Sequence, residues 1–187
     1  MLHPLLTALD QHLHAAGAPR ALEGWRRFLL EFWYFGLKEA RACLFAGLFF
    51  AAVFLVPRGG VFGIARYDLL LVIALGIQGW MLWRKLETFD EFKTILVFHA
   101  LGFALEAFKV SSGIKSWSYP DPALTKVLGV PLFSGFMYAA VGSYIMQAWR
   151  LFDLRIERHP PYWMTTLIAV AIYLNFFTHH EIGRAHV

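Results

Sequence analysis

Three polar side chains share one face of an otherwise apolar segment near the middle of the chain. His99 and Glu106 are seven residues apart, nearly two helical turns, and Lys109 follows Glu106 by about one turn. A carboxylate and an imidazole can accept and pass protons, which predicts acid/base chemistry centred on Glu106, with His99 as a second proton station and Lys109 beside them. The structural alternative is an i, i+3 ion pair between Glu106 and Lys109, with His99 bonded to a neighbouring helix.

Aromatic and polar residues at the ends of other segments are predicted to gather near Glu106. They could bind an apolar or lipid-like molecule, although Trp and Tyr are also common as plain interfacial anchors. The candidate binding residues are Asp68, Trp117, Tyr119, Tyr138, Asn175, His179 and His180. The last two diverge by about 100° on a helix, which makes a weak metal signature, so we expect neither a metal ion nor another cofactor.

The segments that carry these residues are strongly apolar. Hydrophobic residues make up 58% of the 187 residues and charged residues only 16%, a balance outside that of ordinary soluble domains. Because a bilayer core requires about 20 mostly apolar residues per helix, we predict an all-α, polytopic transmembrane helix bundle with about five spanning helices. The predicted spans are 38–56, 67–83, 88–110, 131–149 and 161–180.

Two local signals support these helices. Thr88 and Glu91 have the spacing of a capping box at the start of the third span, where each residue satisfies a free amide of the other. Small residues Gly135, Ala139 and Gly142 repeat on one side of the fourth span, which predicts close approach of a neighbouring helix.

The predicted bundle, 38–180, is one domain, and residues 1–37 are expected to form amphipathic helices along the membrane surface. Lys and Arg are more numerous on the side that holds the N-terminus. This asymmetry predicts a multi-pass protein of the inner (cytoplasmic) membrane with its N-terminus in the cytoplasm. The expected partners are the lipid bilayer and an apolar small molecule.

Charge elsewhere suggests no further site. The net charge of +4 comes without a nucleic-acid-binding motif, so no nucleic-acid partner is expected. A lesser polar group is interpreted as solvated flanks and local ion pairs. It comprises Lys38, Glu39, Arg41, Glu87, Gln147 and Arg150.

Several runs of the chain resemble a bacterial family of integral membrane proteins known as domain of unknown function family 817. The runs are 38–40 with 43–47, 63–68, 87–88 with 98–99, 105–106 with 108–109, 116–120, 129–150 and 175–180. The resemblance implies a helical membrane bundle and brings no activity. Members of that family look longer, which implies that this chain is truncated after His180 and that residues 181–187 are a non-native tail.

A fainter resemblance is to membrane enzymes of carotenoid metabolism. It is carried by Glu106, Gly113, Trp117, Tyr119 and the stretch 129–132. This resemblance implies a proton donor role for Glu106 toward an apolar polyene.

Three functions follow as hypotheses. The first is acid/base chemistry on, or binding of, an apolar or lipid-like molecule at the polar cluster around Glu106. The second is a proton-coupled transporter or channel lined by His99 and Glu106. The third is a structural assembly protein without a catalytic site, in which replacing Glu106 would be silent. The sequence leaves open whether the protein is an enzyme.

Overall fold

The computed structural model describes residues 11–13, 15–19 and 21–178. Their fold is almost entirely helical, as predicted. The elements in chain order are α2 (Gly24–Ala42), α3 (Leu44–Leu55), α4 (Arg66–Trp83), α5 (Phe89–Val110), β1 (Lys126–Val127), β2 (Val130–Pro131), the 3-10 helix η1 (Leu132–Ser134), α6 (Gly135–Phe152) and α7 (Tyr162–Thr178).

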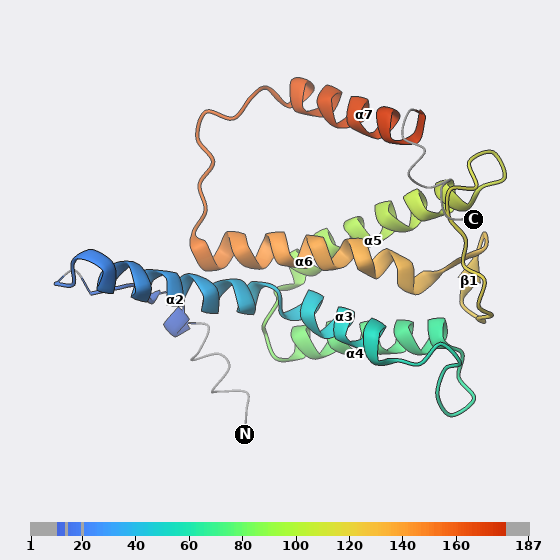
Figure 1. Ribbon diagram of the computed structural model, residues 1–187, viewed down its shortest axis with the longest axis horizontal. Helices are drawn as coiled ribbons and strands as arrows, with labels where there is room; N and C mark the ends of the chain where they lie inside the picture. The colour runs from blue at the N-terminus through green and yellow to red at the C-terminus, as the bar shows by residue number, and fades with distance from the viewer. Residues whose placement is uncertain (1–10, 14, 20, 179–187) are drawn as a thin grey trace.

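Helices α5 and α6 form the centre of the arrangement and pack along one another (Figure 1). Helix α6 also contacts α2 and α3, and α4 packs against α3. The apolar core lies where these helices meet and includes Phe45, Phe49, Leu70 and Phe136. Helix α7 stands apart from the others in Figure 1, and its side chains are exposed as far as Asn175.

No helix of the described part of the chain is both long enough and apolar enough to cross a bilayer. The prediction of a polytopic transmembrane bundle is therefore wrong, and so is the predicted multi-pass inner-membrane localisation with a cytoplasmic N-terminus. The two most apolar helices, α3 and α7, have only 12 and 17 residues, against the roughly 20 that a bilayer core requires.

The helices that are long enough carry too many polar residues. Helix α5 has 22 residues but includes Asp90, Glu91 and Lys93, and α4 contains Arg66 and Asp68. The transporter hypothesis requires a proton path between spanning helices, and the described part of the chain contains no such helix.

The first predicted span, 38–56, is divided between two helices. Helix α2 ends at Ala42, and Cys43 leaves the helical region with φ −80° and ψ 7° before α3 begins at Leu44. Helix α2 includes part of the predicted N-terminal amphipathic region. It leaves Trp25, Phe28 and Trp33 more than half exposed, and Cys43 is the point at which the chain turns into the core.

Local signals at the third and fourth spans are confirmed. Thr88 caps α5, and the reciprocal hydrogen bonds with Glu91 are both present. A β-carbon on Gly142 would lie 2.8 Å from Cγ of Phe98, so α5 and α6 approach closely where the small residues of α6 face α5. The fourth helix itself begins at Gly135, four residues later than predicted, because the chain first forms a short hairpin.

That hairpin pairs β1 with β2 in antiparallel register, Val127 opposite Val130. Its turn residues, Leu128 and Gly129, both have positive φ, 54° and 78°. This is the conformation that a two-residue hairpin turn favours, and glycine adopts it without strain. After the hairpin and η1, both of which contact α5, the chain enters α6.

Candidate functional site

The Glu106 carboxylate lies buried near the end of α5 and is only 2% exposed. The Tyr119 hydroxyl donates a hydrogen bond to Oε2 at 2.8 Å, and the Tyr138 hydroxyl donates one to Oε1 at 2.8 Å. The Lys109 ammonium forms an ion pair with Oε1. Burying a carboxylate is costly unless it is paired and hydrogen-bonded, and these three donors meet that requirement.

Each of the three donors is positioned by a different element. Lys109 is one helical turn from Glu106 on α5. Tyr138 lies in the first turn of α6, and its ring packs directly on Gly102, which has no side chain to exclude it. Tyr119 comes from the loop after α5, which folds back onto that helix.

Hydrogen bonds hold this loop in place. The Ser116 amide donates to the Lys109 carbonyl at 3.0 Å, and Lys126 Nζ donates to the Tyr119 carbonyl at 2.7 Å. The Tyr119 ring meets Trp117 and Tyr67 edge to face, with ring centroids 6.3 and 5.8 Å apart. The loop therefore presents the Tyr119 hydroxyl to Glu106 in a fixed orientation.

The proton donors around Glu106 are held in their protonated forms. Burial and the neighbouring Glu106 carboxylate both raise the pKa of Tyr119 and of Tyr138. Burial alone would lower the pKa of Lys109, but its hydrogen bond and charge interaction with Glu106 outweigh that effect and raise it overall. The two phenols and the ammonium therefore keep the protons with which they hydrogen-bond to Glu106.

A pocket of about 950 Å³ opens beside this cluster. Its wall combines a few polar groups with aromatic and aliphatic side chains, the usual composition of a small-molecule site. The lining residues are Val53, Arg66, Tyr67, Leu70, Glu106, Lys109, Val110, Lys115, Ser116, Trp117, Ser118, Tyr119, Pro120, Phe133 and Met137. Trp117 is 58% exposed.

Four of the sequence-predicted site residues lie together in the pocket wall: Glu106, Lys109, Trp117 and Tyr119. Tyr138 joins them through Glu106 although it is not part of the pocket lining. The i, i+3 ion pair considered in the structural interpretation is present as well, so the pair and the pocket coexist.

Asp68 holds the chain rather than lining the pocket. Its carboxylate accepts from the amides of Leu124 and Thr125, each at 2.9 Å, and from the Thr125 hydroxyl at 2.6 Å. Burial would raise the Asp68 pKa, but these hydrogen bonds together lower it below the ordinary value. Asp68 thus fastens the segment before β1 to the start of α4.

His99 lies on α5 away from the pocket wall. Its ring packs on Phe136, with centroids 4.5 Å apart, and its Nδ1 is buried without a hydrogen-bond partner. Burial lowers its pKa, which favours the neutral imidazole. Asn175 is exposed on α7, and His179 and His180 lie outside the described residues.

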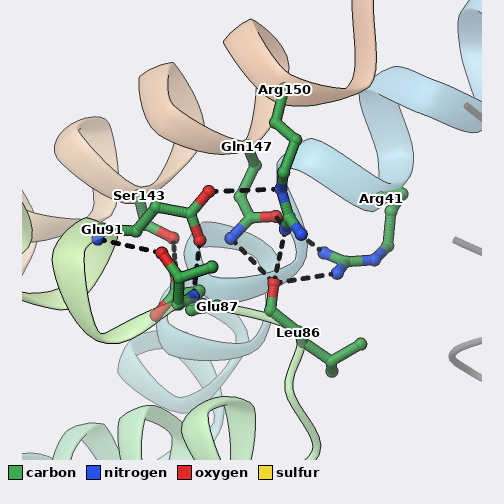
Figure 2. A network of polar contacts seen from close by, with 8 residues as sticks. Arg41, Leu86, Glu87, Glu91, Ser143, Gln147 and Arg150 are labelled. Carbon is green, nitrogen blue, oxygen red and sulfur yellow. Dashed lines mark hydrogen bonds and ion pairs between the residues drawn. The ribbon is translucent and has the colours of Figure 1, made fainter.

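A second buried polar cluster lies at the opposite end of α5 (Figure 2). There the Glu87 carboxylate, 3% exposed, accepts hydrogen bonds from Gln78 of α4 and Ser143 of α6. Glu91 accepts from the Thr88 amide at 2.6 Å and pairs with Arg150 Nε at 3.2 Å.

The Leu86 carbonyl lies at the centre of this second cluster. It accepts from Arg41 at 3.2 Å, from Gln147 at 3.1 Å and from Arg150 at 2.7 Å (Figure 2). The interpretation of Arg41, Glu87 and Gln147 as solvated flanks is wrong, because each is less than 9% exposed. Their role is to join α2, α4, α5 and α6. The one sequence signal was that these polar residues stand at the ends of apolar segments.

Within the described residues, no group of three or more His, Cys, Asp or Glu side chains is arranged to hold a metal ion.

Comparison with known proteins identifies relatives without a described activity. The family "Protein of unknown function (DUF817)" matches residues 31–186. The chain is 46% identical over 154 residues to a Bacillus subtilis (strain 168) protein described as "Uncharacterized protein YoaT". That alignment covers 82% of this chain but only 58% of the relative's length. No solved structure matches the chain.

Proposed function

The chain belongs to the DUF817 family of proteins of unknown function, and we propose that it binds a small apolar or amphipathic molecule in the pocket and exchanges a proton with it at Glu106. The observation that carries the proposal is the position of this carboxylate: it is buried, held by three donors, and part of the wall of a pocket large enough for a small molecule.

The proton acceptor in this proposal is Glu106. Its two carboxylate oxygens accept hydrogen bonds from the three donors. A ligand O–H or acidic C–H that displaces one of these donors can transfer its proton to the oxygen that the donor leaves. The ligand becomes an anion and Glu106 becomes a carboxylic acid. The reverse transfer returns the proton, so the same group serves as base and then as acid.

The two donors in the pocket wall act on the charge that this transfer creates. Tyr119 and Lys109 keep their protons at neutral pH, because the pKa of each is raised. Their O–H and N–H groups can donate to an oxygen on which negative charge develops, which stabilises the transition state more than the neutral ligand. Tyr138 holds the other side of the carboxylate and fixes its orientation.

The aliphatic and aromatic part of the wall supports the choice of ligand class. Val53, Leu70, Val110, Phe133 and Met137 surround the same space as Glu106. An apolar body placed against them removes apolar surface from water, at about 25 cal/mol for each Å². Exclusion of water also strengthens the hydrogen bonds made at Glu106.

The test compares small-molecule extracts of bacteria that produce the wild-type chain, the Glu106→Gln variant or no protein. We expect the wild-type chain to change the profile of apolar compounds in mass spectrometry, and Glu106→Gln to abolish the change. The matched control is Glu31→Gln, because Glu31 is a half-exposed carboxylate on α2 that pairs with Arg27 at 4.0 Å. Equal profiles for wild type and Glu106→Gln, at equal amounts of folded protein, would overturn the proposal.

A further inference from the structure

We infer that the molecule bound in this pocket is an anionic amphiphile, whose carboxylate or phosphate head lies between Arg66 and Lys115 and whose apolar body lies against the far wall. The inference rests on the proposed function and specifies its ligand.

The pocket wall has more basic than acidic side chains. It contains Arg66, Lys109 and Lys115 against one carboxyl group, that of Glu106. The Glu106 charge is already matched by Lys109 in the ion pair. Arg66 and Lys115 remain as positive charge that no carboxylate in the lining balances, and a cleft of one sign attracts ligands of the opposite sign.

One hydrogen bond holds the Arg66 side chain in place. Its Nη2 donates to the Val53 carbonyl at 2.6 Å, at the end of α3, and this bond fixes the guanidinium in the pocket wall. A guanidinium offers five N–H donors in a planar fork that matches the two oxygens of a carboxylate or phosphate. An anion in the pocket would be an acceptor of matching geometry for this guanidinium.

Arg66 also stands at the start of a helix. It is the first residue of α4, and the start of a helix carries partial positive charge from its free amides. Asp68 lies in the same turn of α4, but its carboxylate is directed at the amides of Leu124 and Thr125, so Arg66 and not Asp68 is part of the pocket lining.

The apolar residues of the wall specify the rest of the ligand. An inorganic anion would leave the surface of Leu70, Val110, Phe133 and Met137 uncovered. A neutral hydrocarbon would leave the charges of Arg66 and Lys115 unmatched. Only a molecule with both an anionic head and an apolar body satisfies the two parts of the wall together.

The test is calorimetric titration of the purified chain with dodecanoate, dodecan-1-ol and dodecylammonium, all below micelle-forming concentrations. The three probes share one apolar chain and differ in the charge of the head. We expect one dodecanoate to bind per chain, with an affinity at least about tenfold above that of either other probe. The neutral and cationic heads cannot make the charge-assisted hydrogen bonds that the carboxylate makes.

Variants locate the head. Arg66→Gln and Lys115→Gln should each weaken dodecanoate binding, Arg66→Gln by about tenfold. Arg58→Gln is the matched control, because Arg58 is an exposed arginine outside the pocket lining. Circular dichroism and a thermal transition equal to those of the wild type show that each variant is folded. Equal affinities for dodecanoate and dodecan-1-ol, or dodecanoate binding unchanged in folded Arg66→Gln, would overturn the inference.

The Glu106→Gln variant separates this inference from the proposed function. It should bind dodecanoate at least as tightly as the wild type, because it removes a negative charge from the pocket, while it abolishes the change in extracts. A change in extracts that depends on Glu106, without preference for dodecanoate, would leave the proton exchange standing and remove only the anionic ligand.

Discussion

The Tyr119 hydroxyl lies 2.8 Å from Oε2 of Glu106 and donates a hydrogen bond to that oxygen. This contact joins the loop after α5 to a buried side chain of that helix, and both residues are part of the pocket wall. Because Tyr138 and Lys109 occupy the other carboxylate oxygen, the charge of Glu106 acts on three ionisable neighbours at once.

Removal of the Glu106 charge should make its two phenols easier to ionise. The carboxylate, together with burial, raises the pKa of Tyr119 and Tyr138, and a nearby negative charge disfavours the phenolate. In Glu106→Gln we therefore expect two tyrosines to titrate at lower pH than in the wild type. The measurement is the ultraviolet absorbance of tyrosinate as a function of pH.

The variants Tyr119→Phe and Tyr138→Phe assign the two transitions, and Glu31→Gln is the control that should leave the curve unchanged. A titration of folded Glu106→Gln that superimposes on that of the wild type would show that these hydroxyls do not sense Glu106.

Asp68 should contribute stability that depends on pH. Asp68→Asn leaves the three donors of Leu124 and Thr125 with a poorer acceptor, and we expect a loss of about 1 to 3 kcal/mol at neutral pH. The folded-state pKa of Asp68 lies below its ordinary value of 3.8. The contribution is therefore fully present above pH 3.8 and is lost as the pH falls through the lower, folded-state value.

Urea unfolding of wild type and Asp68→Asn at a series of pH values measures this difference. The two unfolding free energies should be well separated at neutral pH and converge in acid. A constant difference at every pH would mean that the Asp68 charge is not what fastens the loop, and that the substitution acts through packing.

The sequence predicted the contacts that are close in the chain. Thr88 and Glu91 are three residues apart, and so are Glu106 and Lys109, so helical geometry alone brings each pair together. The pairing of Tyr119 with Glu106 was expected only as membership of one cluster. Its atoms meet because the loop after α5 folds back, and that path depends on tertiary contacts with Lys109 and Lys126.

The second polar cluster shows where sequence reasoning fails. Arg41 and Gln147 are 106 residues apart and yet share a hydrogen bond at 3.3 Å. Nothing in the local sequence distinguishes them from solvated polar residues at helix ends. The transmembrane prediction fails for a related reason. Its first span runs across Cys43, where the chain ends one helix and starts another, and composition does not give the length of each helix.

Ser143 provides a test of the second cluster. It is completely buried, and its hydroxyl donates to the Glu87 carboxylate. Ser143→Ala removes a donor from a buried charge, which we expect to lower the free energy of unfolding by about 1 to 3 kcal/mol. Ser111→Ala is the control, because Ser111 is exposed at the end of α5, and we expect a change within about 0.5 kcal/mol. Equal unfolding free energies for the two variants would contradict a structural role for this cluster.

The contact between α5 and α6 at Gly102 links stability to the site. A β-carbon at Gly102 would overlap the Tyr138 ring, whereas one at Gly79 of α4 would meet nothing within 4 Å. Gly102→Ala should therefore lower the thermal transition and cost about 1 to 3 kcal/mol through overpacking. Gly79→Ala is the matched control and should stabilise the chain by up to about 1 kcal/mol, because alanine favours a helix more than glycine.

Gly102→Ala should also displace the Tyr138 hydroxyl from Glu106, since the ring has no other space on α5. The tyrosinate titration measures this second effect: one phenol should ionise at lower pH in Gly102→Ala, while Gly79→Ala leaves the curve unchanged. If Gly102→Ala raised the thermal transition as Gly79→Ala does, the close packing of Tyr138 on α5 would be refuted. The geometry that holds the Glu106 carboxylate in the pocket wall would then be refuted as well.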